Sequence, residues 1–339
     1  MKLDFSTPNQ ESRILSVGSY RPSRVVPNSE IVDRIDSSDE WIRERSGIQS
    51  RRFASKDETV IAMSKAASEV ALRRAGIEMT EVDAVIMATV SYPYQTPSGA
   101  TELIRELGNP KAAAFDISAA CAGFCYGLGM ASDLIRAGTA QYVLVVGVER
   151  LTDFTDPDDR GTAFIFADGA GAVLVGPSQE SGIGPMVWGS DATNREAIAL
   201  EPSWLEIRDS TEKSWPEISM AGQTVFRWAV YEMAPMALKA IEKAGLTVET
   251  LDAFIPHQAN LRIIDALAKA MKLPDRVAIA KDVVTAGNTS AASIPLAMDA
   301  LLTERPDLHG KSALMIGFGA GLVYAGQVAL LPPEPKFGT

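Results

Sequence analysis

Cys121 is the first candidate for chemistry, because the chain has only two cysteines and this one stands at a predicted strand-to-helix turn. It lies in the segment DISAACAGF, between an apolar segment and a helical pattern. A helix N-terminus favours a thiolate and lowers the pKa of the thiol, so Cys121 is predicted to be a nucleophile. The alternative is a buried cysteine that acts as a small hydrophobe, and Cys125 fits that role better. The apolar positions of the helix share one face: Phe124, Leu128, Ala131 and Ile135.

His257 and Asn288 are residues of the second half that could assist such a nucleophile. His257 follows the apolar run AFIP, so we expect it at the carboxyl end of a buried strand, where α/β proteins place ligands. Asn288 lies in GNTSAAS, 167 residues after Cys121, and its alternative role is a local cap or turn. His309, in the turn ERPDLHG, is expected to be solvated. The joint placement of cysteine, histidine and asparagine favours one catalytic site.

Other kinds of site are disfavoured by the spacing of the same residues. The C-x3-C spacing of Cys121 and Cys125 is not the C-x2-C of redox or zinc sites, so we expect no metal and no thiol redox protein. The glycine-rich run Gly317–Gly321 is not followed by a helical pattern, which argues against a dinucleotide site. A tight turn that directs a backbone N–H to a substrate oxygen is the better interpretation.

The elements that position these residues form an internal duplication. ALRRAGIEMTEVDAVI (71–86) and AIEKAGLTVETLDAFI (240–255) are 169 residues apart and identical at six of sixteen positions. In each copy a helix ends at Ala-Gly and an apolar strand follows. The duplication predicts an α/β protein with five layers, α/β/α/β/α. We expect halves 1–180 and 181–339, with the junction and an inserted loop within 179–217. Two unrelated α/β domains are the alternative.

Composition limits the class of protein. A net charge of −11 disfavours nucleic acid and anionic membranes as partners. The low cysteine count indicates a reducing compartment, hence the cytoplasm. Residues 1–13 lack the apolar core of a signal peptide. The apolar stretch 313–331 is long enough for a membrane span, but its glycines and Pro332-Pro333 favour two buried strands around a turn.

Four motifs resemble those of the type III 3-oxoacyl-[acyl carrier protein] (ACP) synthases: SAACAGF, PHQANLRI, GNTSAASIPLA and GFGAGL. The resemblance runs from about Arg13 to the C-terminus and is greatest to actinobacterial-type members. It implies a thiolase-like fold, a Cys121–His257–Asn288 site and an oxyanion hole formed by the backbone N–H groups of Cys121 and Ala320. The implied reaction is a decarboxylative condensation of an acyl-CoA with malonyl-ACP, which initiates fatty acid synthesis. CoA thioester is a substrate here, and no cofactor is implied.

The resemblance also places the substrates. It assigns the ACP contact to Arg227, Arg262 and Lys269, with ordinary solvated charge as the alternative. Thr96 aligns with a phenylalanine that acetyl-preferring relatives send into the acyl pocket across a dimer interface, so a homodimer and branched or longer primers are expected. Phe318 is assigned to the same pocket. The CoA-binding residues that the resemblance implies are Trp41, Arg45, Arg160, Gly222, Phe226 and Asn260.

Three competing functions remain open from the sequence. One keeps the fold but places the chain in a polyketide or antibiotic pathway, as a starter-selecting synthase or an acyltransferase. Another is a catalytically silent scaffold subunit, which the intact Cys121, His257 and Asn288 disfavour. The last is a thiol redox protein, which the C-x3-C spacing disfavours.

Overall fold

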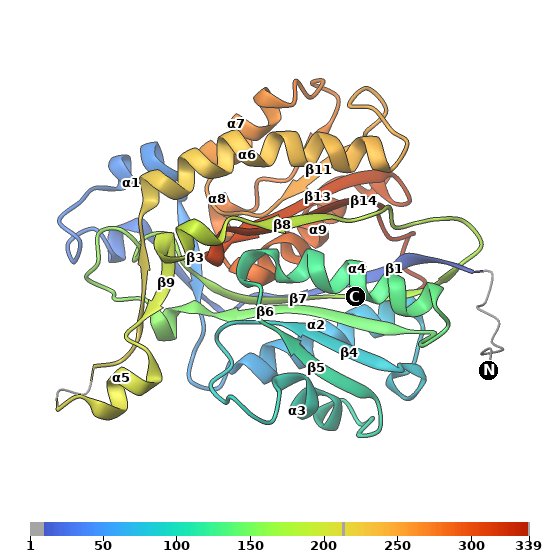
Figure 1. Ribbon diagram of the computed structural model, residues 1–339, viewed down its shortest axis with the longest axis horizontal. Coiled ribbons are helices and arrows are strands. Elements are labelled where there is room, and N and C mark those ends of the chain that lie inside the picture. Colours follow the sequence, from blue (N-terminus) through green and yellow to red (C-terminus); the bar gives the residue numbers. More distant parts are fainter. Residues whose placement is uncertain (1–9, 212–213, 338–339) are drawn as a thin grey trace.

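Two five-stranded sheets form the framework of the computed structural model, which describes residues 10–211 and 214–337 (Figure 1). In both sheets three neighbouring strands are parallel to one another, and each of the next two strands is antiparallel to the strand before it. The first sheet runs β5 (Ala113–Ile117), β4 (Ala84–Ala88), β6 (Val143–Arg150), β7 (Asp168–Ser178), β1 (Glu11–Tyr20). The second runs β12 (Ala278–Ile279), β11 (Ala253–Pro256), β13 (Ser312–Gly319), β14 (Val323–Leu330), β8 (Val187–Ser190).

Helices complete five layers, as the duplication predicted. The central layer is α4 (Gly123–Arg136) and α9 (Ser293–Glu304), whose apolar side chains share one core with both sheets. The outer face of the first sheet packs against α2 (Val60–Ala75) and α3 (Gly99–Glu106). The outer face of the second packs against α6 (Gly222–Lys243) and α7 (Leu261–Ala270). The shorter helices are α1 (Asp39–Ser46), α5 (Trp204–Asp209) and α8 (Val283–Ala286).

Local sequence explains why these elements form and end where they do. The Thr59 side chain caps α2 by accepting from the Ala62 N–H, and Gly76 ends the helix in the left-handed conformation with φ +66°. The strands β6 and β13 are buried along almost their whole length, because helices cover both of their faces. Each large apolar side chain buried in this way contributes about 1.5–3 kcal/mol to folding.

The structure corrects the register of the duplication at the catalytic turns. The short helices η3 (Ala120–Ala122) and η6 (Ser290–Ala292) are counterparts, because α4 and α9 begin directly after them and both first residues have positive φ, +43° and +46°. The counterpart of Cys121 is therefore Ala291, and Asn288 corresponds to Ser118. The sequence offset of 167 identified the counterpart turn correctly but paired the wrong residues within it.

A glycine in each half lets the two halves approach closely at these turns. A Cβ atom on Gly147 of β6 would lie 2.2 Å from the carbonyl oxygen of Ala291. A Cβ atom on Gly317 of β13 would lie 2.7 Å from the carbonyl oxygen of Cys121. Each turn is thus held against a strand of the opposite half, and both contacts require glycine.

The stretch between the halves contains a small lobe of its own. After β8, the chain forms a hairpin of β9 (Ile198–Glu201) and β10 (Glu217–Met220), with α5 between the two strands (Figure 1). A second small pair joins β2 (Arg24–Pro27) to β3 (Ser50–Phe53). The boundary between the two halves at residue 180 stays a prediction.

The apolar stretch 313–331 forms two paired antiparallel strands, β13 and β14, as predicted. Across the described residues, no helix has the length and apolar character that a membrane crossing requires. Most of the segment 1–13, on which the signal-peptide prediction rests, lies outside the described residues.

Candidate active site

Cys121 stands where η3 leads into α4, at the turn predicted from the sequence. It is 9% exposed, and β13 covers it so closely that a Cβ atom on Gly319 would lie 2.8 Å from the sulfur. Burial raises the pKa of the Cys121 thiol to about 12, although a hydrogen bond with Ser290 acts in the opposite direction. The sequence-based expectation of a lowered pKa is therefore wrong for this structure, because desolvation outweighs the helix N-terminus. In the resting site Cys121 is a thiol.

His257 follows β11, at the carboxyl end of the strand. It is buried, and burial lowers its pKa to about 3, so the ring is neutral at physiological pH. Nδ1 lies 2.7 Å from Ser293 Oγ, which also accepts a hydrogen bond from the Gln258 N–H. Among the described residues Nδ1 is the only acceptor within reach of the Ser293 hydroxyl, so we assign the serine hydrogen to Nδ1. Nε2 then carries the ring hydrogen and is a donor.

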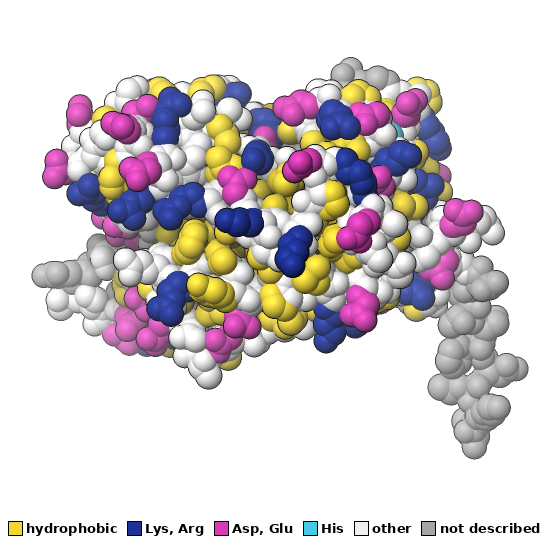
Figure 2. Space-filling view, turned by 90° about the horizontal axis from the view of Figure 1, so that it is seen from above, with side chains coloured by type: hydrophobic (Ala, Val, Ile, Leu, Met, Phe, Trp, Pro, Cys, Tyr) yellow, Lys and Arg dark blue, Asp and Glu magenta, His cyan; other side chains and the backbone are white. Residues whose placement is uncertain are grey.

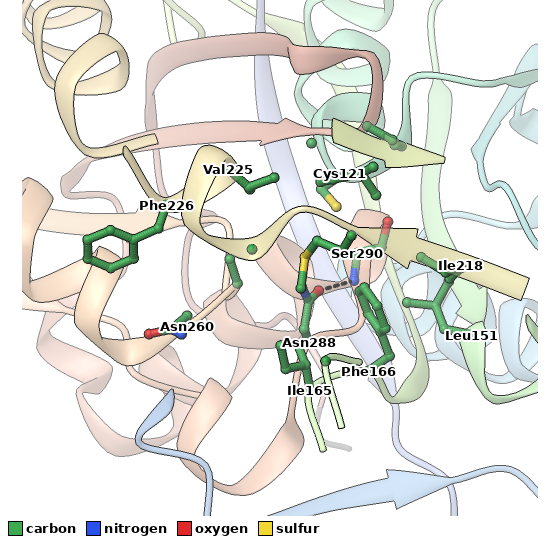
Figure 3. A pocket seen from close by; sticks show the side chains of 18 of the residues that line it. Cys121, Leu151, Ile165, Phe166, Ile218, Val225, Phe226, Asn260, Asn288 and Ser290 are labelled. Carbon is green, nitrogen blue, oxygen red and sulfur yellow. Dashed lines mark hydrogen bonds between the residues drawn. The ribbon is translucent and has the colours of Figure 1, made fainter. Parts of the chain in front are cut away.

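Asn288 precedes η6, and backbone hydrogen bonds tie it to the segment before β7. Its N–H donates to the Ile165 carbonyl, and its own carbonyl accepts from the Ala167 N–H. Its side-chain Oδ1 accepts from the Ser290 N–H at 2.8 Å. That contact fixes the orientation of the carboxamide, because only its oxygen can accept. The amide Nδ2 is left as a donor, opposite the Oδ1 that the dashed line in Figure 3 joins to Ser290.

One cavity of about 580 Å³ brings together Cys121, His257 and Asn288. Figure 3 shows Cys121 and Asn288 approaching it from separate elements, with Ser290 between them. Ala320, the predicted second oxyanion residue, also lines the cavity and begins η8 (Ala320–Leu322). Phe318 lines it as well and packs edge-on against the His257 ring, with the ring centres 5.4 Å apart.

The predicted CoA-binding residues line the same cavity, and we call its mouth the part where the lining residues Arg45, Arg160 and Gly222 are exposed. The Arg160 guanidinium lies 4.9 Å from the centre of the Trp41 ring, and that of Arg45 lies 5.6 Å from it. Arg160 and Trp41 thus contact each other directly, so an adenine ring between them would require Arg160 to move. All six predicted residues line the cavity: Trp41, Arg45, Arg160, Gly222, Phe226 and Asn260.

Asn260 has a structural role that the motif alone did not reveal. It is the N-cap of α7, where its Oδ1 accepts from the Arg262 N–H. Its side-chain amide donates to the Arg45 carbonyl at 3.1 Å and so joins α7 to α1. Both ends of this side chain are therefore already hydrogen-bonded.

The predicted carrier-protein residues divide between the cavity mouth and the surface beyond it. Arg227 and Arg262 line the cavity, and Arg262 lies over the Phe226 ring at 5.2 Å from its centre. Lys269, on α7, is exposed and does not line the cavity. Figure 2 shows basic, acidic and apolar side chains interspersed over the face that carries α6 and α7.

Thr96 and His309 also lie away from the cavity. Thr96 is exposed in the loop between β4 and α3 and does not line the cavity of this single chain. His309 was expected to be solvated, but it is only partly exposed, and its Nδ1 donates to the Pro332 carbonyl at 2.9 Å.

Sequence reasoning missed the residues that support the triad. Ser290 and Ser293 orient Asn288 and His257, as described above. Glu149, at the end of β6, is completely buried and hydrogen-bonded to the Ser290 hydroxyl. Its signal was present in the sequence, because an acidic residue directly after the apolar run YVLVVGV is unusual.

Chemically, the cavity offers a thiol, two neutral hydrogen-bond donors and apolar walls. Among the described residues, no group of three or more His, Cys, Asp or Glu side chains could hold a metal ion. This arrangement is suited to acyl transfer through a covalent thioester.

Family models and curated relatives that match this chain all belong to the same family. The family models for 3-oxoacyl-[acyl-carrier-protein (ACP)] synthase III and for its C-terminal part match residues 115–192 and 241–330. The chain is 57% identical over 321 residues to a beta-ketoacyl-[acyl-carrier-protein] synthase III of Streptomyces glaucescens, covering 95% of this chain and 96% of the relative. It is 48% identical over 320 residues to the mycobacterial synthase III of Mycobacterium avium, covering 94% and 96% of the two chains.

Solved structures agree. The chain is similar to the priming beta-ketosynthase from the R1128 polyketide biosynthetic pathway, with 48% identity, a TM-score of 0.95, and coverage of 98% of this chain and 99% of that one. It is also similar to the 3-oxoacyl-[acyl-carrier-protein] synthase III of Aquifex aeolicus VF5, with 36% identity, a TM-score of 0.86, and coverage of 94% and 99%.

Proposed function

Because the chain belongs to the 3-oxoacyl-[acyl-carrier-protein] synthase III family, we propose that it condenses an acyl-CoA primer with malonyl-ACP. The products are 3-oxoacyl-ACP, carbon dioxide and CoA, and the reaction initiates fatty acid synthesis. The chain is thus a condensing enzyme of the acyltransferase type. The observation that carries the site assignment is the convergence of Cys121, His257 and Asn288 on one apolar cavity.

In the first stage Cys121 becomes acylated. Its sulfur attacks the carbonyl carbon of the acyl-CoA thioester, and CoA leaves as the acyl-enzyme forms. The backbone N–H groups of Cys121 and Ala320 are proposed to hold the oxyanion of the tetrahedral intermediate. Gly319 supports this arrangement, because the absence of a side chain there lets β13 lie directly against the sulfur. Losing one such donor typically costs about 3–4 kcal/mol of transition-state stabilisation.

In the second stage malonyl-ACP loses carbon dioxide and the resulting carbanion attacks the acyl-enzyme. The enolate oxygen that develops during decarboxylation needs hydrogen-bond donors. His257 supplies Nε2–H and is oriented by the Ser293 hydroxyl. Asn288 supplies its amide N–H and is oriented by the Ser290 N–H. Because the thioester carbonyl itself accepts the electrons, this chemistry uses neither a metal nor a redox cofactor.

The cavity mouth is proposed to hold CoA and then the carrier protein. Trp41 and Arg160 would stack on adenine, Arg45 would contact phosphate, and Gly222, Phe226 and Asn260 would line the pantetheine arm. The exposed Arg227, Arg262 and Lys269 are proposed to bind the acidic carrier protein on the face shown in Figure 2.

We propose a homodimer that completes the acyl pocket. β5 is an edge strand of the first sheet, and its residues 114–117 are only partly exposed in the single chain. The loop that carries Thr96 follows β4, the neighbour of β5, and exposes Val90 and Tyr94. A second copy on this edge would cover those side chains and bring Thr96 to the acyl pocket beside Phe318.

Thr96 and the primer can be tested together. A threonine leaves more room than a phenylalanine, so branched or longer primers are expected to be accepted. Thr96→Phe is expected to shift the preference towards acetyl-CoA, measured by competition between acetyl-CoA and isobutyryl-CoA. An unchanged profile in a dimeric variant contradicts this assignment, and a monomer by sedimentation contradicts the shared pocket.

A second candidate function is starter selection in a polyketide pathway. The observation that favours it is the TM-score of 0.95 to a priming ketosynthase at 48% identity. The two functions share the chemistry and differ in primer and carrier protein. Comparing condensation on a fatty-acid ACP with condensation on a polyketide ACP separates them. The two free, buried cysteines are compatible with the cytoplasmic location that we propose.

The central experiment is intact-protein mass spectrometry after mixing the enzyme with a panel of acyl-CoAs. We expect one acyl group to attach, on Cys121, and to disappear when malonyl-ACP is added, with 3-oxoacyl-ACP appearing in step. Cys121→Ala should remove the adduct, whereas Cys125→Ala, which changes a buried cysteine one turn away, serves as the matched control. An adduct on any other residue contradicts the assignment.

A further inference from the structure

The proposed acylation requires that the Cys121 thiol loses its proton, and the triad offers no group to receive it. Cys121 is buried, and its pKa is raised to about 12. His257 would accept a proton only at Nε2, but the Ser293 hydroxyl at Nδ1 leaves Nε2 already protonated. Asn288 is an amide and accepts no proton. Another acceptor must therefore lie within reach of the sulfur.

Glu149 is a buried carboxyl group that is hydrogen-bonded to the Ser290 hydroxyl. It is 0% exposed, at the end of β6. Ser91 donates to its Oε2 at 2.6 Å, Thr89 at 3.3 Å and the Val90 N–H at 3.1 Å. Ser290 donates to its Oε1 at 3.2 Å. Its pKa is raised by burial to about 7, so it can both accept and release a proton near physiological pH.

Among the described residues, no basic side chain forms an ion pair with Glu149. Arg150, the next residue along β6, instead pairs with Asp153 at 3.1 Å. Asp168, opposite Arg150 on β7, is occupied by the Ala54 N–H and by Thr152. The turn η6 and the loop after β4 present only hydroxyls and backbone N–H groups to it, so the titratable group coupled to it is Cys121.

Ser290 connects the two groups. Its hydroxyl oxygen lies 3.2 Å from Glu149 Oε1 and within hydrogen-bonding reach of the Cys121 side chain, and its one hydrogen can be donated to only one of these two groups at a time. Ser290 has a φ of +46°, the backbone conformation that Ala120 adopts in the counterpart turn. Its N–H donates to Asn288 Oδ1. Figure 3 shows Ser290 between Cys121 and Asn288. The hydrogen bond from Ser290 to Glu149 already points in the direction in which a proton would travel away from the sulfur.

We propose that Glu149, acting through the Ser290 hydroxyl, accepts the Cys121 proton during acylation and returns it after condensation. This inference rests on the proposed function. The sulfur proton moves to Ser290 Oγ as the Ser290 hydrogen moves to Glu149 Oε1. The new S–C bond forms, the bond from carbon to the CoA sulfur breaks, and CoA leaves as a thiolate that takes a proton from water. After condensation the released Cys121 thiolate regains its proton by the reverse route.

The test measures the single-turnover rate of Cys121 acylation between pH 5.5 and 9 by intact-protein mass spectrometry. In the wild type the rate should rise with pH through an ionisation near 7, because only the carboxylate can accept the proton. Glu149→Gln should lower the rate at pH 7.5 by about 100-fold and abolish that ionisation. Glu149→Asp, which keeps an ionisable group, should retain it.

Asp168→Asn is the matched control, because Asp168 is also a buried acid with no contact to the sulfur. It should acylate like the wild type. The rate of malonyl-ACP decarboxylation is a second readout. In Glu149→Gln this rate should fall much less than the rate of acylation, since His257 and Asn288 are proposed to support decarboxylation. Should Glu149→Gln not fold, Ser290→Ala keeps the carboxyl and is expected to lose the same ionisation.

Three outcomes are decisive. A wild-type profile without an ionisation near 7 overturns the inference while leaving the proposed function intact. Equal acylation and equal pH profiles in Glu149→Gln and Asp168→Asn overturn it as well. Failure of the wild type to form an adduct on Cys121 at any pH contradicts the proposed function itself.

Discussion

The turns that precede α4 and α9 have the same backbone and different chemistry. Both begin with a residue at positive φ, both lead directly into a central helix, and both press against a glycine of the opposite half. In the first half this position holds the sulfur of Cys121. In the second half the residue at the matching position is Ala291, and the proposed catalytic side chain is that of Asn288, three residues earlier. The duplicated backbone supplies positions, and each half has filled a different one.

The largest expected effect comes from removing the functional group of each turn in separate variants. Cys121→Ala should abolish the acyl-enzyme and lower condensation at least about a thousandfold, yet still allow malonyl-ACP decarboxylation. Asn288→Ala should do the reverse, lowering decarboxylation by about 100- to 1,000-fold while acylation persists. Mass spectrometry follows the first step, and release of labelled carbon dioxide follows the second. Equal losses of both steps in both variants would show that the turns do not divide the chemistry.

The glycine contacts test whether the two halves support each other equally. Gly147→Ala and Gly317→Ala each place a methyl group against backbone atoms of the opposite turn, so both should destabilise the fold by about 2–3 kcal/mol. Gly222→Ala, where no atom lies within 4 Å, is the control. Urea unfolding of the three variants measures this, and a marked inequality between the first two would identify the half that tolerates displacement.

Ser293→Ala tests whether the Ser293 hydroxyl decides which ring nitrogen of His257 carries the hydrogen. Without the Ser293 hydroxyl, the ring can place its hydrogen on either nitrogen, so decarboxylation should fall about 10-fold while acylation changes little. Carbon dioxide release at saturating malonyl-ACP measures the effect. Ser64→Ala, which changes a buried serine bonded only to a carbonyl within α2, is the control. A rate equal to that of the wild type would show that the ring keeps its tautomer without Ser293.

The smallest effect concerns pH and contrasts an acid in the first half with the base in the second. The pKa of His257 is lowered on folding from 6.5 to about 3, so its contribution to stability is present above 6.5 and is lost progressively as the pH falls from 6.5 to 3. The pKa of Glu149 is raised from 4.5 to about 7, so its contribution is present below 4.5 and is lost as the pH rises through 7.

We therefore expect opposite pH trends, on the order of 1 kcal/mol per pH unit, when two variants are compared with the wild type. His257→Gln should become relatively more stable as the pH is lowered from 7 to 5, and Glu149→Gln as it is raised from 5 to 7. Urea unfolding at both pH values provides the comparison. Parallel trends would mean that neither group changes its pKa on folding.

Much of this architecture could be predicted from the sequence because it depends on local patterns. The repeated helix-Ala-Gly-strand unit predicted two matching halves, and the position of Cys121 between a strand and a helical face predicted its turn. Cys121 and His257 could be singled out as candidates because cysteine and histidine are rare in this chain. The same reasoning failed where contacts between the halves decide the outcome.

Three such contacts explain the differences. Desolvation of Cys121 by β13 raises its pKa, and nothing near Cys121 in sequence indicates that strand. Ser290 and Glu149 are 141 residues apart and meet only because β6 packs against η6. The positive φ of Ala120 and Ser290 shows which residues of the two turns correspond. From the amino-acid sequence alone, the two turns could be aligned three residues out of register.

The hairpin of β9 and β10 has a consequence for how such an enzyme can change. Its residues Ile198, Leu200, Ile218 and Met220 form part of the cavity wall, yet neither strand belongs to the two large sheets. Part of the cavity wall is therefore formed by a module that lies outside the two large sheets. Grafting this hairpin between relatives offers a way to alter which thioesters enter while the reaction inside stays the same.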